Sequence, residues 1–212
     1  NIIANPNCST AQLVIVLKSL NDNFKIKRIV ISTYQSTSGA GKKPMDELID
    51  QTKSILNNKS FEVKNFTKQI AFNAIPHIDS FSEDGYTKEE LKMIKETNKI
   101  LGTKIDITAT CVRIPVLVSH AESVNIEFEN DFSIKKVKEL LNAAEGCKVV
   151  DENSDGGYIT PVDAEGKNET FISRIRVDNS KNNSLNLWIV SDNLLRGAAL
   201  NAVEIAETYF RM

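Results

Sequence analysis

Cysteine, histidine and long hydrophobic runs are scarce in this 212-residue sequence, and each shortage excludes a class of protein. Three cysteines, at positions 8, 111 and 147, are odd in number and far apart, which argues against a disulfide framework and predicts a reducing, cytoplasmic compartment. Two histidines and no C-x-x-C pair leave a structural zinc site without ligands, so no metal is expected. No apolar run approaches the roughly 18 residues of a membrane span and no signal peptide is recognisable, so no membrane partner is expected.

The sequence also has no large excess of positive or of negative charge. The 26 basic and 28 acidic residues give a net charge of −2, which provides no reason to expect a nucleic-acid partner. Nine Gly and five Pro are too few for a low-complexity chain, whereas 41% apolar residues are enough for a buried core. The composition therefore predicts a globular protein.

Hydrophobic periodicity and turn residues predict helices and strands that do not alternate strictly. A first helix, capped by Ser9 or Thr10, is followed by helices expected at about 44–56, 87–101, 133–144 and 193–209. Strands are expected at 26–34, at 69–75, twice within 105–128, and at 147–151, 170–177 and 184–191. No linker divides residues 1–212, and the β-rich runs at 105–128 and 170–191 suggest antiparallel pairs. The predicted fold class is α+β, with a mixed, largely antiparallel sheet flanked by helices.

Cys8 stands where turn residues give way to the first predicted helix. A thiol at a helix N-terminus feels the positive end of the helix dipole and nearby free amides, which favour the thiolate and therefore a nucleophile. An inert, buried cysteine is the alternative. Cys111 and Cys147 fall within apolar strand patterns and are expected to be structural.

A thiolate nucleophile needs an acid or base, and the two histidines are the candidates. His120 begins a strand soon after Arg113, whereas His77 follows a proline in a loop, so the pattern favours His120 over His77. Either ring could instead be an ordinary surface or core histidine. Arg113, in an otherwise apolar strand, either forms a buried ion pair or offers its planar fork to a substrate carboxylate.

A charged pair and a small polar loop can each be explained either by ordinary structure or by a functional site. Glu89 and Lys92 lie three residues apart on one predicted helix face, as a solvated pair or as part of a site. The loop 36–41, Ser-Thr-Ser-Gly-Ala-Gly, either brings backbone amides to a phosphate or nicotinamide or forms a simple turn. No G-x-G-x-x-G follows any strand, so the sequence contains no dinucleotide-binding fingerprint.

Four motifs taken together resemble aspartate-semialdehyde dehydrogenases in content, order and spacing. They are Asn5–Thr10, Tyr34–Gly41, Cys111–Val116 followed by His120, and Ser191–Ala199. The resemblance covers essentially the whole chain and implies that residues 1–212 are the catalytic and dimerisation domain, with a fold like the C-terminal domain of glyceraldehyde-3-phosphate dehydrogenase-like enzymes. It also implies that a Rossmann-type NADP-binding domain precedes this piece and packs against the final helix, about 193–209.

The activity that the resemblance implies is NADPH-dependent reductive dephosphorylation of L-aspartyl-4-phosphate to L-aspartate 4-semialdehyde and phosphate. This step belongs to aspartate-family biosynthesis of lysine, threonine, methionine and diaminopimelate. The implied assembly is a homodimer and the implied cofactor is NADP, with Ser38 and Gly39 beside the nicotinamide and Asn193 where the family often has Gln. Without its cofactor domain, the isolated chain is expected to be inactive.

The same resemblance implies a role for each residue of the catalytic centre. Cys8 corresponds to the nucleophile that forms a thioester, His120 to the acid/base and Gln35 to the residue that orients the reacting groups.

Four more residues are implied to bind the substrate. They are Arg113 at the α-carboxylate, Glu89 at the ammonium group, and Lys92 and Asn7 at the phosphate.

Other readings remain open from the sequence. An N-acetyl-gamma-glutamyl-phosphate reductase-like enzyme shares the reaction scheme but usually carries a Gly-Cys-Tyr type of motif in place of Asn-Cys-Ser-Thr. A non-catalytic dimerisation module is the alternative from another class, and glyceraldehyde-3-phosphate dehydrogenase is a more distant third. The polar stretch 151–169 has no assigned role.

Overall fold

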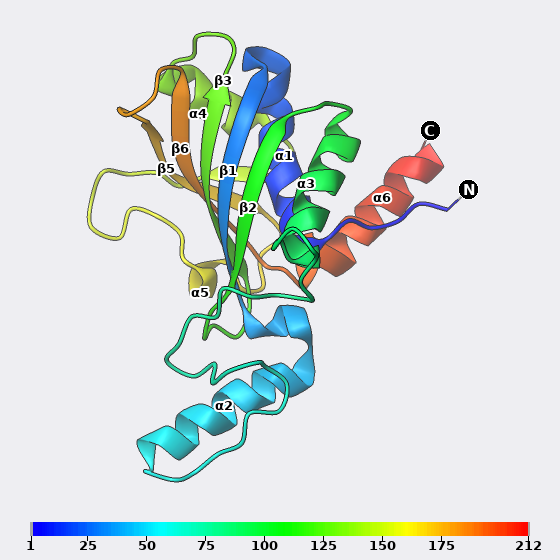
Figure 1. Ribbon diagram of the computed structural model, residues 1–212. Helices are drawn as coiled ribbons and strands as arrows, with labels where there is room; N and C mark the ends of the chain where they lie inside the picture. Colours follow the sequence, from blue (N-terminus) through cyan, green and yellow to red (C-terminus); the bar gives the residue numbers. More distant parts are fainter. Residues whose placement is uncertain (1, 212) are drawn as a thin grey trace.

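A six-stranded sheet organises the computed structural model, which describes residues 2–211 (Figure 1). The strands are β1 (Ile26–Gln35), β2 (Asp106–Arg113), β3 (His120–Phe128), β4 (Cys147–Val149), β5 (Thr170–Val177) and β6 (Ser184–Ser191). Their spatial order is β2-β1-β3-β6-β5-β4. The β1–β3, β3–β6 and β5–β6 pairs are antiparallel, whereas β1–β2 and β4–β5 are parallel. The predicted α+β fold with a mixed, largely antiparallel sheet is confirmed.

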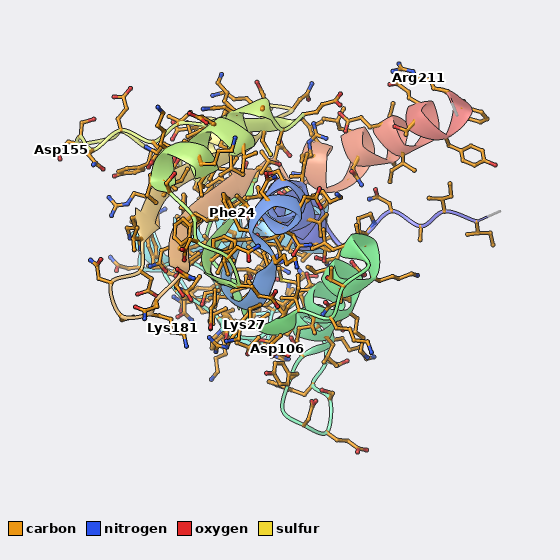
Figure 2. All side chains as sticks on the ribbon, turned by 90° about the horizontal axis from the view of Figure 1, so that it is seen from above. Phe24, Lys27, Asp106, Asp155, Lys181 and Arg211 are labelled. Carbon is orange, nitrogen blue, oxygen red and sulfur yellow. The ribbon has the colours of Figure 1, made fainter. Side chains whose placement is uncertain are left out.

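Three helices cover one face of the sheet: α1 (Cys8–Phe24), α3 (Lys88–Leu101) and α4 (Ile134–Ala143). The remaining helical segments are η1 (Thr37–Ala40), α2 (Lys42–Leu56), α5 (Pro161–Ala164), η2 (Leu195–Ala199) and α6 (Leu200–Arg211). Viewed from above, α6 extends away from the sheet with Arg211 at its far end, and Asp155 marks the tip of the 151–169 segment on the opposite side (Figure 2). None of the helices within residues 2–211 is long and apolar enough to cross a membrane.

The core lies between the sheet and these three helices, and the strand pattern explains why. Alternate residues of β1, such as Ile29 and Ile31, point toward the helices and are fully buried, whereas Val30 and Ser32 lie on the other face. Helix α1 fills the space above them with apolar side chains at helical spacing: Leu13, Val16, Leu17 and Leu20. Each such burial contributes about 1.5–3 kcal/mol, which makes α1 the most firmly held helix.

Local capping signals position helices α3 and α4 as predicted. Thr87 and Glu90 form a capping box at the start of α3, and Gly102 ends the helix in the left-handed conformation. The Ser133 side chain accepts a hydrogen bond from the Lys136 backbone N–H at the start of α4.

The strand predicted at 69–75 is wrong. Phe72 adopts a positive φ of 57°, which breaks the extended path, and the backbone N–H groups of Ile70 and Ala71 donate to Gln51 Oε1 instead of to a strand. Only Ile75 pairs with a strand, through an isolated bridge to Arg113. The apolar residues of this segment serve a small separate core under α2, formed with Leu48.

The antiparallel pair expected within 105–128 is also wrong, although the pair within 170–191 is confirmed as β5–β6. Strands β2 and β3 both form, but β1 lies between them. The connection 114–119 crosses the end of β1, where Ile114 N–H donates to the Gln35 carbonyl and Thr37 N–H donates to the Val116 carbonyl. This crossing carries the chain to the other side of β1 and prevents a direct β2–β3 hairpin.

The predicted final helix begins later and less regularly than expected. Asp192 Oδ1 accepts hydrogen bonds from the backbone N–H groups of Leu194 and Leu195, the next segment, η2, is a π-helical turn, and α6 follows. Within 200–211, no residue of α6 is buried.

Candidate active site

Cys8 is the first residue of helix α1, as predicted, but the predicted caps Ser9 and Thr10 are wrong. Asn7 caps the helix, because its Oδ1 accepts hydrogen bonds from the backbone N–H groups of Ser9 (3.0 Å) and Thr10 (3.3 Å). The hydroxyls of Ser9 and Thr10 are instead buried without a hydrogen-bond partner among the described residues. Asn7 therefore fixes the backbone on which the thiol stands.

The protonation state of the Cys8 thiol differs from the expectation for a helix N-terminus. Burial raises the pKa of Cys8 to about 11, and the charge of Glu89 adds to the rise. The backbone N–H of Ser9 and the charge of Arg113 act in the opposite direction without reversing it. Burial therefore outweighs the effect of the helix terminus, and the Cys8 thiol of this domain is protonated at neutral pH.

The other two thiols are still less acidic than Cys8, in line with their predicted structural role. Burial raises the pKa of Cys147 to about 12 and that of Cys111 further. Both lie in strands, and Cys111 Sγ contacts Met93 Sδ in the core at 3.7 Å.

Sheet register brings polar residues from four strands into one row beneath the start of α1. Gln35 of β1 pairs with Arg113 of β2. On the other side of β1, the register with β3 places Gln35 next to His120. His120 in turn pairs with Ser191 of β6. All four are buried on the face that the helices cover. Residues separated by up to 156 positions thus share one edge of the sheet.

The Arg113 guanidinium makes a single hydrogen bond within the described residues. Its side chain is 6% exposed, and Nη1 donates to the Ser36 carbonyl at 2.6 Å. Burial lowers the pKa of Arg113, while the Glu89 charge opposes that shift, and a guanidinium remains charged at neutral pH in either case. Within residues 2–211 no carboxylate forms an ion pair with it, so the internal ion pair, the alternative to carboxylate binding, is absent there.

Glu89 links the start of α1 to the sheet. Its Oε1 accepts hydrogen bonds from Asn7 Nδ2 (2.8 Å) and Gln35 Nε2 (3.1 Å), and its Oε2 pairs with Lys92 Nζ (3.3 Å). Lys92 also pairs with Asp79 Oδ2 at 3.0 Å. Partial burial lowers the pKa of Lys92, but its contacts with Asp79 and Glu89 outweigh this and raise it overall. Glu89 and Lys92 thus belong to one network of polar contacts with Asn7, Gln35 and Asp79.

His120 is held by Ser36, which the sequence indicated only as part of the loop 36–41 and not as a partner of the histidine. The backbone N–H of Ser36 donates to His120 Nδ1 (3.1 Å), and the Ser36 hydroxyl lies 3.0 Å from the same atom. Because a backbone N–H can only donate, Nδ1 presents its lone pair and the neutral ring carries its proton on Nε2. Burial and the Arg113 charge lower the pKa of His120 to about 3, so the ring is neutral at pH 7. His120 Nε2 is buried and has no hydrogen-bond partner among residues 2–211.

The loop residues Ser38 and Gly39 lie over this row together with Asn193. Asn193 Oδ1 accepts hydrogen bonds from Ser36 Oγ (3.2 Å), Ser38 Oγ (3.0 Å) and the Ser119 backbone N–H (2.9 Å). A Cβ on Gly39 would lie 2.9 Å from His120 Nε2, so only glycine fits there without displacing a neighbour. The structure therefore brings all ten predicted site residues into one connected cluster.

Sequence reasoning missed two other residues that position the cluster. Asp79 holds Lys92, although its positive φ of 69° in a loop gives no sequence signal. Gly197 of η2 packs against the start of α1, where a Cβ would lie 2.7 Å from Cys8 Cβ. The motif Ser191–Ala199 contains Gly197 and could have indicated it.

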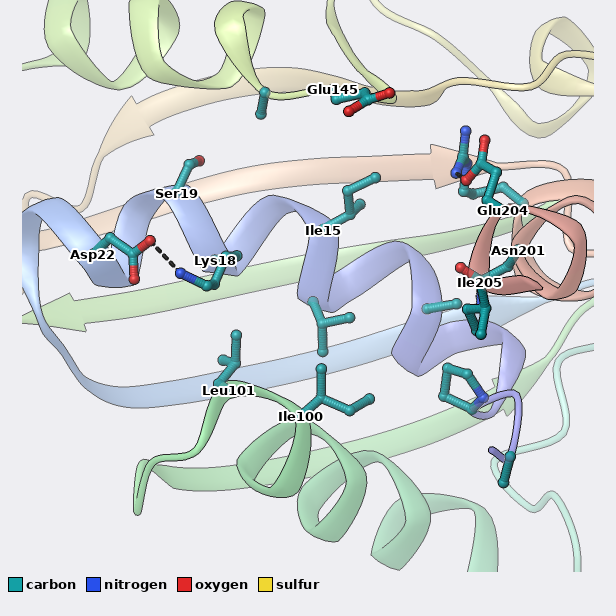
Figure 3. A pocket seen from close by; sticks show the side chains of 16 residues that line it. Ile15, Lys18, Ser19, Asp22, Ile100, Leu101, Glu145, Asn201, Glu204 and Ile205 are labelled. Atoms are coloured by element: carbon teal, nitrogen blue, oxygen red, sulfur yellow. Dashed lines mark hydrogen bonds and ion pairs between the residues drawn. The ribbon is translucent and has the colours of Figure 1, made fainter. Parts of the chain in front are cut away.

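Of two cavities in the structure, one adjoins this cluster and the other does not. A cavity of about 170 Å³ is lined by Arg113 together with His77, Asp79 and residues 65–67. A larger groove of about 660 Å³ lies between α1, α3 and α6, lined by apolar residues such as Ile15 and Ile205, and none of the ten cluster residues lines it (Figure 3). Within the described residues, no three His, Cys, Asp or Glu side chains are grouped as a metal site.

Known proteins match the chain over nearly its whole length. The family described as semialdehyde dehydrogenase, dimerisation domain, matches residues 17–196. Aspartate-semialdehyde dehydrogenase of Rickettsia typhi is 54% identical over 207 residues, which are 98% of this chain and 61% of that protein. The chain thus spans about three fifths of the length of this relative.

Solved structures agree in fold. The crystal structure of aspartate semialdehyde dehydrogenase II complexed with ASA from Vibrio cholerae has a TM-score of 0.96 at 45% identity, covering 99% of this chain and 62% of that one. Aspartate semialdehyde dehydrogenase with NADP from Candida albicans, at 24% identity and a TM-score of 0.70, shares the fold and covers 98% of this chain and 57% of its own. The chain therefore belongs to the semialdehyde dehydrogenase family, whose dimerisation domain it matches, and within that family to the aspartate-semialdehyde dehydrogenases.

Proposed function

We propose that residues 1–212 are the catalytic and dimerisation domain of an enzyme that converts L-aspartyl-4-phosphate to L-aspartate 4-semialdehyde and phosphate with NADPH. The observation that carries the proposal is the buried Arg113 guanidinium, which has no carboxylate partner within residues 2–211 and lies in one cluster with Cys8, Glu89 and His120. A buried cation without a counter-ion costs free energy that an anionic ligand offsets. The chemistry fits a small amino acid with a carboxylate at one end and a reactive acyl group at the other.

In this proposal, charge complementarity orients the substrate. The planar fork of Arg113 binds the α-carboxylate through two parallel hydrogen bonds. The Glu89 carboxylate, already near a cation in Lys92, attracts the substrate ammonium group. The Lys92 ammonium group binds the substrate phosphate. Asn7 supports this arrangement because it donates to Glu89 and caps the start of α1.

Cys8 carries the covalent step. The thiol proton passes to the phosphate group of the substrate, and Sγ then attacks the acyl carbon as the thiolate. An S–C bond forms, the C–O bond to phosphate breaks, and phosphate leaves with the electron pair and the proton. Gln35, fixed between Thr33 and Glu89, orients the reacting acyl group, and the Nε2–H of His120 donates to the carbonyl oxygen on which negative charge develops. His120 therefore enters the reaction as a hydrogen-bond donor, since its Nδ1 already accepts from Ser36 and the neutral ring keeps its Nε2 proton.

The residues proposed beside the nicotinamide lie close to the catalytic row. The backbone of Gly39 approaches His120 so closely that a side chain there would collide with the ring, and Asn193, whose oxygen already accepts three hydrogen bonds, keeps Nδ2 as a donor. When bound, NADPH supplies the hydride that reduces the thioester carbonyl. Collapse of the resulting hemithioacetal regenerates the Cys8 thiolate and releases the aldehyde, with His120 and Gln35 holding the oxygen during this step.

The assembly is proposed to be a homodimer that forms through the sheet face without helices. Segment 151–169 covers part of that face, where Trp188 Nε1 donates to the Ile159 carbonyl at 3.1 Å. The half formed by β2, β1 and β3 is left open, with Thr110 and Ser123 exposed. This open half supports pairing with a second copy.

Helix α6 and the groove of Figure 3 support a further part of the proposal, that the cofactor-binding domain of the complete enzyme packs there. Val203, Tyr209 and Phe210 are 55%, 49% and 83% exposed, which is unusual for one helix of a folded domain. We also propose a cytoplasmic location, where Cys8 stays a free thiol, and a place in aspartate-family amino-acid biosynthesis.

The substitution Arg113→Lys in the complete enzyme tests the function. A lysine keeps the charge but loses the fork, so we expect kcat/KM for L-aspartyl-4-phosphate to fall about 10- to 100-fold, the range for hydrogen bonds to charged groups. Arg176→Lys, at an exposed strand position, is the matched control and retains activity. Near-normal turnover of Arg113→Lys, or equal turnover with an N-acetylated glutamyl phosphate, would contradict the proposed substrate.

A further inference from the structure

Glu122 is a carboxyl group fully buried beneath the catalytic row, and the proposed reaction does not use it. It lies on β3 two residues after His120, on the same face of the sheet, and pairs across the sheet with Thr33 of β1 and Ile189 of β6. Its exposure is 0%, and within residues 2–211 neither carboxyl oxygen makes a hydrogen bond of normal geometry or an ion pair. A buried carboxylate without a cation is among the most expensive groups a fold can contain.

The helix that carries Cys8 supplies a polar neighbour of this carboxyl. Gln12 follows Cys8 by four residues, so both side chains lie on one side of α1. Gln12 Oε1 accepts a hydrogen bond from Ser191 Oγ at 2.7 Å, whereas Gln12 Nε2, like the two oxygens of Glu122, is buried without a hydrogen bond of normal geometry among the described residues. Helix α1 is thus tied to the row by the hydrogen bond between Ser191 and Gln12, and the Gln12 side chain also lies beside Glu122.

The charges around Glu122 do not provide a counter-ion in contact. Besides Cys8 at the start of α1, the buried titratable groups on the elements packed about it are Cys111 and Arg113 on β2, Glu89 and Glu90 on α3, and His120 on β3. Arg113 is the one cation among these buried groups, and it donates to the Ser36 carbonyl and not to Glu122. An ionised Glu122 would stand near a second carboxylate and would raise the pKa of the Cys8 thiol.

We propose that Glu122 is a positioning residue that acts as a neutral carboxylic acid, packing beneath the first turns of α1 without placing a negative charge beneath Cys8. A protonated carboxyl can both donate its O–H and accept from an amide N–H, whereas a carboxylate only accepts. Burial raises the pKa of Glu122 well above its ordinary value, in agreement with this state. The inference rests on the proposed role of Cys8, but it can be tested without turnover.

The first measurement reads the carboxyl directly by infrared spectroscopy of the chain at pH 7. We expect a C=O stretch of a protonated carboxylic acid that disappears in Glu122→Gln. Glu127→Gln is the matched control, because it makes the same substitution on the same strand at a residue paired with Lys27 on the other face, and it retains the band. Absence of the band from the wild-type protein overturns the proposal, whether or not the variants fold.

The second measurement reads the thiol by iodoacetamide alkylation of Cys8 against pH. At pH 7 we expect Glu122→Gln to react within about twofold of wild type, because both side chains are neutral and the pKa of Cys8 shifts by well under one unit. At alkaline pH the variant should become faster, because ionisation of the wild-type carboxyl opposes the thiolate and the two groups titrate together. A variant already about tenfold faster at pH 7, equal to one pKa unit, would mean that Glu122 is ionised in the native protein and would refute the inference. Neither measurement depends on catalysis. The proposed reaction could therefore be disproved while this inference holds, and this inference could be disproved while the proposed reaction holds.

Discussion

Gly197 and Cys8 approach each other so closely that a Cβ on Gly197 would lie 2.7 Å from Cys8 Cβ and 3.1 Å from Cys8 Cα. The contact joins η2, near the end of the chain, to the first residue of α1. Because both neighbours belong to helix backbones, neither can rotate away as a flexible side chain could. The Cys8 position therefore depends on a glycine 189 residues later in the sequence.

Substitution of Gly197 by alanine should displace η2 or the start of α1. We expect the free energy of unfolding to fall by about 1–3 kcal/mol, the usual cost of overpacking, and the alkylation rate of Cys8 to change. Urea unfolding and iodoacetamide labelling measure the two effects. Ala199→Ser, which adds one atom at an exposed position of the same turn, should leave both quantities unchanged. An unaltered Gly197→Ala protein would show that the contact is not tight in solution.

The three thiols should differ in reactivity, with Cys8 first. Its pKa of about 11 is below that of Cys147, about 12, and of Cys111, which is higher still. Since the thiolate is the nucleophile and pH 7–10 lies below the Cys8 pKa, its alkylation rate should rise about tenfold for each pH unit in this range. Mass spectrometry after limited iodoacetamide labelling measures both points. Preferential labelling of Cys111 or Cys147 in the folded protein, or a rate independent of pH, would contradict the assignment.

The features that the sequence predicts well are those set by contacts between residues close together in the chain. Thr87, Ser133 and Gly102 mark helix ends through contacts within a few residues, so those boundaries were predictable. The pKa of Cys8 was not, because the helix terminus is local while the burial that dominates comes from the whole fold. The strand at 69–75 failed for the same reason, since its apolar residues pack on α2 and its N–H groups bond to Gln51.

The candidate site divides in a similar way. The resemblance to a family named Arg113, Gln35 and His120 individually, but their alignment in one row follows from sheet register, which has no local signal. Ser36, which holds Arg113 through its carbonyl and His120 through its N–H, acts through backbone groups that every residue type has. Sequence therefore identified side chains with chemistry and missed a residue that works through its main chain.

The buried His120 ring should make the fold sensitive to acid. Its pKa is about 3 in the folded chain against about 6.5 in the unfolded chain, so between these values only the unfolded state binds the proton. The stabilisation is complete above pH 6.5 and is lost as pH falls toward 3, by about 1.4 kcal/mol for each pH unit. Urea unfolding of wild type and His120→Asn at pH 4, 5, 6 and 7 measures the difference, with His77→Asn as the control that keeps the buried ring. Parallel stability curves for wild type and His120→Asn would show that the ring titrates normally.

A homodimer through the open sheet face should dissociate when a charge is placed at its centre. Ser123 of β3 is exposed on that face, and Ser123→Arg in two copies would bring like charges together. We expect wild type to be a dimer by light scattering at micromolar concentration and Ser123→Arg to be a monomer. Asn23→Arg, exposed at the end of α1 on the helix side, is the matched control and should remain a dimer. A monomeric wild type, or a dimeric Ser123→Arg, would place the interface elsewhere.

The chain of 212 residues alone should not catalyse the proposed reaction at a measurable rate, although Cys8, Gln35, Arg113 and His120 are all in place. Orienting a hydride donor against the thioester can supply roughly 7 to 11 kcal/mol of the barrier. The sequence contains no G-x-G-x-x-G motif to bind a pyrophosphate. Contacts of Gly39 and Asn193 with the nicotinamide are too few to position the cofactor without that binding site. The assay runs in reverse with aspartate semialdehyde, phosphate and NADP, while calorimetry measures NADP binding. Addition of the cofactor-binding part of the enzyme as a separate domain should restore activity if it packs on α6. Robust turnover or tight NADP binding by the chain alone would show that these residues suffice to position the cofactor.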